Sequence, residues 1–167
     1  MLQESLRLEL DAIVKAYCLT TTDVWDEAAS LLVKARTIYV VGFQASEGAG
    51  HGFASRLLWA RSNVIFIDNA SGTFGEIINA DPKQSAVVLV DTASYATRGI
   101  KLVEKLVDGH AAGHRPDKVQ SLGFCLYALR LRGAYACEKT FWDSTASLSV
   151  VLNLLIDAPL PLNEAEG

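Results

Sequence analysis

The sequence predicts an α/β fold built on a parallel sheet, and three observations support this. Three short runs, residues 37–41, 63–68 and 86–90, are rich in β-branched and other apolar side chains and lack polar alternation. Segments with helical periodicity separate them. Strands that are apolar throughout are covered on both faces, as in parallel sheets packed between helices. Ligands in such folds sit beyond the carboxyl ends of the strands, so the loops after the three runs are where chemistry is expected.

Two helices are predicted before the first strand. The first has an apolar stripe at spacings of three and four, which is typical of an amphipathic helix and consists of Leu2, Leu6, Leu10, Ile13, Val14 and Tyr17. Such a stripe could pack on the second helix or on a partner chain. Residues 20–22 interrupt the pattern, and Asp23 is the expected N-cap of the second helix. The buried face predicted for that helix is Val24, Ala28, Leu31, Leu32 and Ala35.

After the first strand, Gly42 and the loop 43–48 lead into a third helix, whose buried residues are predicted as Phe53, Leu57 and Leu58. Thr73 is expected to cap a short helix that ends near Ile78. The helix after the third strand should bury one side, made of Ile100, Val103, Leu106 and Val107.

The C-terminal third is harder to interpret. Residues 124–131 are apolar but rich in Leu and Arg, and they fit a strand or a helix equally well. The pattern recovers with Ser144 as the expected N-cap of a final helix, which should bury Leu148, Val151, Leu152 and Leu155. The tail, residues 161–167, is expected to be disordered.

Composition restricts the classes of function. The chain of 167 residues is the size of one domain, and its formal net charge of −4 argues against a nucleic-acid-binding surface. Three cysteines without regular spacing fit a reducing cytoplasm better than a disulfide framework. The N-terminus, residues 1–16, lacks the unbroken apolar core of a signal peptide, and no apolar run approaches the length of a membrane span. We therefore expect a cytoplasmic protein with no membrane partner.

Four features together resemble the SIS (sugar isomerase) domain, and most closely the effector-binding domain of RpiR-type transcriptional regulators. They are a helix that ends at residues 32–36 directly before the first strand, and the Gly-Phe-x-x-Ser loop at residues 42–46. The third is the strand that runs into residues 91–98, and the fourth is residues 141–144, which open the last helix. Their order and spacing make the resemblance more specific than any one of them.

The resemblance implies a three-layer αβα sandwich with a parallel sheet of about five strands. The SIS domain would cover residues 23–160, preceded by an N-terminal helix and linker at residues 1–22. It also implies a homodimer and a site for a phosphorylated sugar or sugar acid, with no cofactor. RpiR-type regulators carry an N-terminal helix-turn-helix domain, so this chain would be either a fragment of a regulator or a stand-alone SIS protein.

The resemblance places the phosphate ligands in two loops. They are Ser46 in the first loop and Thr92, Ser94 and Thr97 in the second, and Gln44 is a further candidate beside Ser46. Short hydroxyls and backbone N–H groups at helix N-termini are natural ligands for anions. Each hydroxyl also has a plain structural interpretation, as a loop or helix cap.

The second loop departs from the family pattern. Asp91 stands near the position of a serine, and Tyr95 stands where a glycine would allow close backbone approach. This fits a sensor better than an isomerase. An isomerase needs a general acid and base, for which only Glu47 and His51 are candidates. Neither a dinucleotide fingerprint nor a metal-ligand spacing is present, so no metal site is expected.

Residues 110–138 depart from the family more strongly, because no recognisable fourth strand follows Ala112. A pair of compensating frame shifts and plain divergence are both open, and peptide sequencing across this segment distinguishes them. The expected function is thus an effector sensor that binds a sugar phosphate, with its DNA-binding domain outside this chain. The alternatives are an aldose–ketose sugar-phosphate isomerase and a dimerisation module without a ligand.

Overall fold

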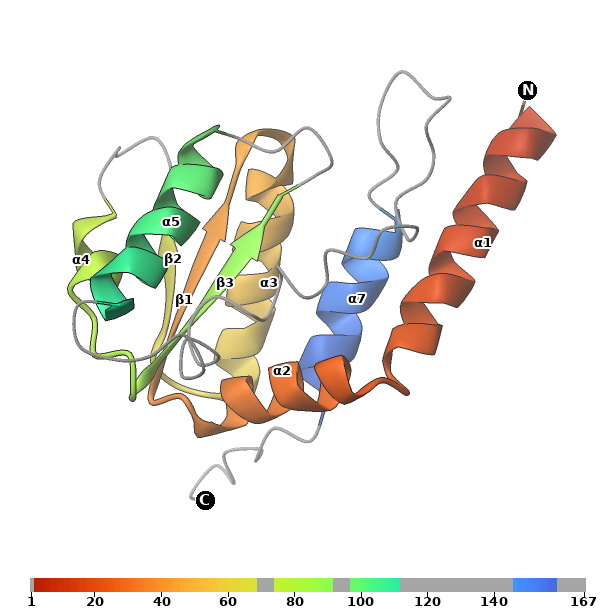
Figure 1. Ribbon diagram of the computed structural model, residues 1–167. Helices are drawn as coiled ribbons and strands as arrows, with labels where there is room; N and C mark the ends of the chain where they lie inside the picture. The colour runs from red at the N-terminus through yellow and green to blue at the C-terminus, as the bar shows by residue number, and fades with distance from the viewer. Residues whose placement is uncertain (1, 69–73, 92–96, 112–145, 159–167) are drawn as a thin grey trace.

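The computed structural model describes residues 2–68, 74–91, 97–111 and 146–158, and every structural statement below refers to these residues. Figure 1 shows the elements. In chain order they are α1 (Leu2–Leu19), α2 (Asp23–Lys34), β1 (Thr37–Gly42), the 3₁₀ turn η1 (Gln44–Ser46), α3 (Glu47–Ala60), β2 (Val64–Ile67), α4 (Gly75–Ile78), β3 (Ser85–Val90), α5 (Thr97–Ala111) and α7 (Ala146–Asp157).

The three strands form an open parallel sheet in the order β2-β1-β3. Ile38 of β1 pairs with Val64 on one side and with Ala86 on the other. The prediction of an α/β fold with a parallel sheet is therefore confirmed. The described residues contain three strands, not the expected five or so. The segment where a fourth strand was expected, after Ala112, lies outside them.

Successive residues of β1 supply two different hydrophobic clusters, which explains why the strand lacks polar alternation. Ile38 and Val40 point into a cluster with α2, α3 and α7. Tyr39 and Val41 point into a second cluster with α4 and α5. Helices thus cover both faces of the described sheet (Figure 1).

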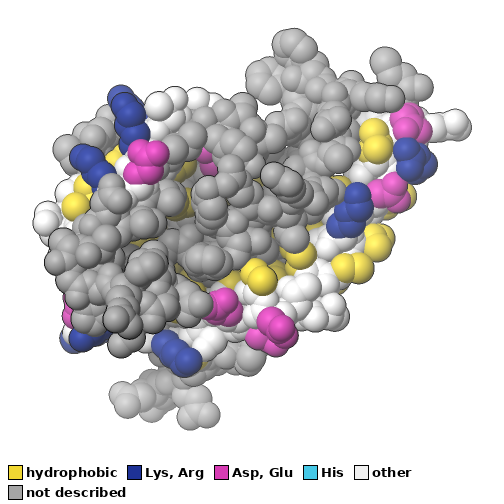
Figure 2. Space-filling model, viewed as in Figure 1, with side chains coloured by type: hydrophobic (Ala, Val, Ile, Leu, Met, Phe, Trp, Pro, Cys, Tyr) yellow, Lys and Arg dark blue, Asp and Glu magenta, His cyan; other side chains and the backbone are white. Residues whose placement is uncertain are grey.

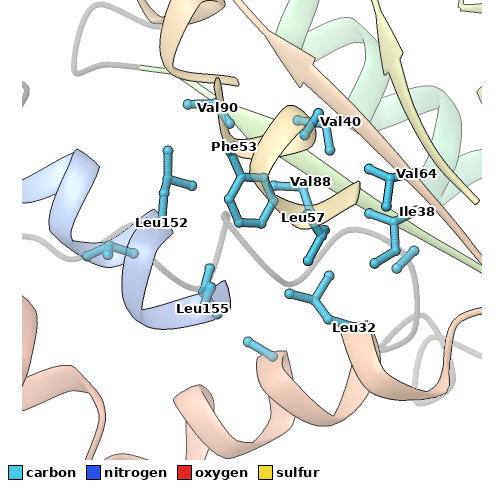
Figure 3. Close-up of a cluster of buried hydrophobic side chains, with 14 of the residues drawn as sticks. Leu32, Ile38, Val40, Phe53, Leu57, Val64, Val88, Val90, Leu152 and Leu155 are labelled. Atoms are coloured by element: carbon cyan, nitrogen blue, oxygen red, sulfur yellow. The ribbon is translucent and has the colours of Figure 1, made fainter. Parts of the chain in front are cut away.

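Figure 3 shows the larger cluster, in which α3 lies between the sheet and α7. Phe53 and Leu57 of α3 are fully buried against strand valines and isoleucines. All four residues predicted to be buried in the last helix, Leu148, Val151, Leu152 and Leu155, are buried. The side chain of Arg61, just after α3, donates to the carbonyls of Leu32 and Ala35 and so joins the end of α3 to the end of α2.

Several predictions at the helix surfaces are wrong. The N-cap of α2 is Thr22, whose Oγ1 accepts from the Trp25 N–H, and Asp23 is the first helical residue. Val24 is exposed, because Trp25 and Ala29 turn inward instead. Leu58 of α3 is likewise exposed.

Helix α1 forms as predicted but does not bury its predicted stripe. Its buried residues are Ala16 and Leu19, and it packs against α7. Five of the six stripe residues are exposed: Leu2, Leu6, Leu10, Val14 and Tyr17. In the last elements, Leu106 is buried as predicted. The N-cap position of α4 is Phe74, which makes no side-chain capping bond, and not the expected Thr73. Ser144 and residues 124–131 lie outside the described residues, as does the expected disordered tail, residues 161–167.

No helix within the described ranges is both long and apolar enough to cross a bilayer.

Candidate functional site

The topology of the sheet singles out the carboxyl ends of β1 and β3. These two strands are neighbours, yet the helices that follow them lie on opposite faces. Helix α3, after β1, packs in one cluster, and α5, after β3, packs in the other. Adjacent parallel strands whose connections diverge in this way leave a crevice at their carboxyl ends, where ligands of open α/β sheets bind. The β1–α3 turn lies at one side of the carboxyl ends of β1 and β3.

The β1–α3 turn is tight enough to require glycine at its start. A Cβ on Gly42 would lie 2.5 Å from the Cα of Glu47 and 2.8 Å from the carbonyl oxygen of Ser46. A Cβ on Gly50 would in turn lie 3.1 Å from the Cα of Gly42. The first turns of α3 therefore rest directly on the end of β1, and the N-terminus of α3 is held at the carboxyl edge of the sheet.

Phe43 fixes this turn to the second loop. Its N–H donates to the carbonyl of Val90 at 2.9 Å, which extends the β1–β3 pairing by one bond. Its ring is 1% exposed and packs in the cluster under α5. A Cβ on Gly99 would lie 3.2 Å from that ring, so the first turn of α5 passes close to Phe43. The N-termini of α3 and α5 are thus brought to the same edge, and each carries partial positive charge.

Ser46 is the most unusual residue of the turn. It is fully buried at the N-cap of α3, and its own N–H donates to the carbonyl of Phe43 at 2.9 Å. Its side chain makes no capping bond, and its Oγ has no hydrogen-bond partner among the residues that the structure describes. Burying a hydroxyl without a partner costs about 1–3 kcal/mol. The residue that the resemblance assigns to phosphate binding thus carries a buried hydroxyl without a partner in the described part of the chain.

Gln44 adds a second sign of strain in the same turn. Its φ of 49° lies in the left-handed region, which is uncommon for residues other than glycine. Its side chain is exposed. Backbone conformations of this kind often occur where a site is preorganised.

Among the described residues, the side chains of the two candidate acid–base residues, Glu47 and His51, do not contact each other through a hydrogen bond. Glu47 is the partly buried first residue of α3, and exposed His51 lies one turn later, as predicted. The ring of His51 packs edge-on against Phe66 of β2, with centroids 5.1 Å apart. No hydrogen bond links Glu47 to His51 within the described part of the chain. His51 is therefore directed towards β2, away from the edge between β1 and β3.

The second loop is described only at its ends. Asp91 follows β3 and is partly buried, and Thr97 is the exposed first residue of α5. Thr92, Ser94 and Tyr95 lie outside the described residues. The structure thus places Ser46, Gln44 and Thr97 near one edge of the sheet.

The chemistry available at this edge is that of anion binding. Two helix N-termini and a buried hydroxyl can donate to an anionic oxygen. In the described ranges, no three His, Cys, Asp or Glu side chains are grouped so that they could hold a metal ion.

Three residues that shape the site were not predicted as part of it: Gly42, Phe43 and Gly99. Glycine directly after a strand was a sequence signal for Gly42, and an isolated aromatic residue in a polar loop was one for Phe43. The contact between Phe43 and Gly99 joins residues distant in the sequence, and no local pattern could have revealed it.

Comparisons with protein-family models, with curated proteins and with solved structures each return no match.

Proposed function

We propose that this chain binds a phosphorylated sugar or sugar acid at the carboxyl edge of β1 and β3, with Ser46 donating to the phosphate. The observation that supports this most directly is the buried Oγ of Ser46 at the N-terminus of a 14-residue helix, which has no hydrogen-bond partner among the described residues. An anionic oxygen at this position would accept from the hydroxyl and from the first N–H groups of α3. Binding would thereby remove the cost of the unpartnered hydroxyl.

Because Ser46 has no exposed surface, the ligand reaches its hydroxyl only after a local opening. The strained backbone at Gln44 is the natural hinge for that opening. Binding would then be limited by a conformational step, and the observed rate would level off at high ligand concentration.

The role proposed for this site is that of an effector sensor in a homodimeric RpiR-like regulator. We further propose the SIS fold, a three-layer αβα sandwich with about five strands. The similarity of the Gly-Phe-x-x-Ser loop and of the strand–loop–helix order supports this proposal. The direction of His51 towards Phe66 disfavours the isomerase alternative, since its imidazole is not presented to the proposed site.

A thermal-shift screen tests the site. The ligands are phosphorylated sugars and sugar acids, each paired with its unphosphorylated form. A ligand at a hundred times its Kd stabilises the native state by about 2.7 kcal/mol, which at about 2–4 °C per kcal/mol is a shift of several degrees. The phosphorylated forms should shift the melting temperature and the unphosphorylated forms should not.

Two serine variants locate the binding. Ser46→Ala should lose most of the ligand-induced shift, whereas Ser62→Ala, at an exposed serine between α3 and β2, should keep it. If Ser46→Ala keeps the full shift, the proposed site is wrong. Turnover of an aldose or ketose phosphate by the purified chain would favour the isomerase instead.

A further inference from the structure

The outer face of α1 presents a continuous row of apolar side chains to solvent. Leu2, Leu6, Leu10, Val14 and Tyr17 are between 52% and 84% exposed. Figure 2 shows hydrophobic side chains on the surface over α1, between acidic and basic ones. Single exposed apolar residues are ordinary, but a continuous row marks an interaction surface.

Among the described residues, burial of α1 is concentrated towards one end of the helix. Its two buried residues, Ala16 and Leu19, both lie near its C-terminal end. Its N-terminal turns lie beyond the end of α7 (Figure 1). Most of the stability of a helix in a protein comes from packing of its apolar face, and the two buried residues cover only part of the apolar surface of these 18 residues. A helix with apolar residues on two sides is built to lie between two packing partners.

We propose that the outer row of α1 is the interface of a homodimer. Leu2, Leu6, Leu10 and Val14 are spaced by four residues and form a single ridge along the helix. Ridges of this kind pack into the equivalent groove of another helix, at a crossing angle of about −50°. A surface of this type is self-complementary, as a two-fold interface requires. The dimer axis passes close to Leu6 and Leu10, the middle of the ridge.

The exposed area agrees with a second copy as the occupant. The five side chains together expose about as much surface as three fully exposed ones, on the order of 400 Å² per copy. Two copies would bury on the order of 800 Å² of apolar surface, which at ~60% apolar content is roughly 1,300 Å² of interface. That value reaches the range of specific complexes, at its lower end.

A lipid surface fits the helix less well. The charged residues of α1 are Glu4, Arg7, Glu9, Asp11 and Lys15, so acidic side chains outnumber basic ones. Helices that lie on anionic membranes carry a basic polar face. Arg7 is moreover engaged by Glu4 and Asp11 on the same helix, at 2.7 and 3.0 Å.

The test is sedimentation velocity of the full chain across the micromolar range. The wild type should dimerise, and Leu10→Glu should weaken dimerisation at least about tenfold by burying a charge at the axis. Leu58→Glu is the matched control, because Leu58 is 51% exposed and Leu10 is 52% exposed. Circular dichroism checks that both variants remain folded. A monomeric wild type, or equal dimerisation of the two variants, would overturn the proposal.

A cysteine cross-linking variant tests the interface if Leu10→Glu does not fold. Leu10→Cys should form a covalent dimer under mild oxidation, above the level that the natural cysteines give, and Leu58→Cys should not. Equal yields from the two variants would contradict the interface. Association with anionic vesicles by a chain that stays monomeric would show a lipid occupant and would also overturn it.

The interface deepens only the homodimer element of the proposed function and does not depend on the ligand. Leu10→Glu should keep the ligand-induced thermal shift, and Ser46→Ala should keep the dimer. The two proposals can therefore fail separately.

Discussion

Replacing Ser46 by alanine should stabilise the chain in the absence of ligand. Serine at an N-cap usually contributes about 0.5–2 kcal/mol through its side-chain bond to the helix. Ser46 makes no such bond, so alanine forfeits nothing there. The substitution removes a hydroxyl that is fully buried without a partner in the described part of the chain.

The expected gain is on the order of 1 kcal/mol, the low end of the cost of a buried unpaired hydroxyl, because one small void is left behind. For a domain of 167 residues this raises the melting temperature by about 2–4 °C. Residues that bind a ligand commonly lower the stability of the free protein. A gain in the free energy of unfolding of Ser46→Ala would therefore be consistent with a binding role for Ser46.

The assay is urea denaturation of the ligand-free wild type, Ser46→Ala and Ser62→Ala, followed by circular dichroism. Ser62 is exposed, and its substitution should change the free energy of unfolding by less than about 0.5 kcal/mol. A loss of about 1 kcal/mol or more in Ser46→Ala would refute the reasoning, since it would mean that the hydroxyl is already satisfied.

Three further predictions concern the elements that position the site. Gly42→Ala should lower the free energy of unfolding by at least about 1–3 kcal/mol, because its Cβ clashes with the first turn of α3. Gly52→Ala is the control: its Cβ would enter open space, so the same urea titration should show a gain of up to about 1 kcal/mol. Arg61→Met should cost about 1.5–3 kcal/mol by removing charged donors from the last carbonyls of α2, and exposed Arg36→Met should change little. Burial, and secondarily the nearby Glu76, raise the pKa of Tyr39. The stability that neutral Tyr39 contributes is therefore fully present below about pH 10 and is lost as pH rises through the folded-state pKa. Unfolding midpoints measured on both sides of about pH 10 should show this loss in the wild type, and Tyr39→Phe should not show it.

The strands and most helices could be predicted because their patterns are local. Runs without polar alternation at residues 37–41 and 86–90 indicate burial on both faces, and β1 and β3 lie there and contribute to two hydrophobic clusters. The buried face of α7 was predicted completely for the same reason. Periodicity was less reliable at helix ends, where Val24 and Leu58 are exposed although each continues an apolar pattern.

The site could be predicted only in part. The order of strand, loop and helix placed Ser46 at the ligand end of the sheet, and the structure agrees with that position. No local pattern indicated that its hydroxyl would be buried without a partner among the described residues. That depends on how the turn folds over Gly42 and on Phe43, which reaches across to Val90 and Gly99.

The sequence by itself therefore determined the class of fold, the direction of the strands and the turn in which to look for a site. These follow from the spacing of apolar residues and from the turn chemistry of glycine, which act over a few neighbouring positions. Only the tertiary structure decided which apolar stripe is buried and which is left to solvent. The stripe of α1 looks like any core-facing stripe in the sequence, but the packing of Ala16 and Leu19 on α7 turns it outward. Burial is settled by which helix faces are already occupied, and that information is spread over the whole chain.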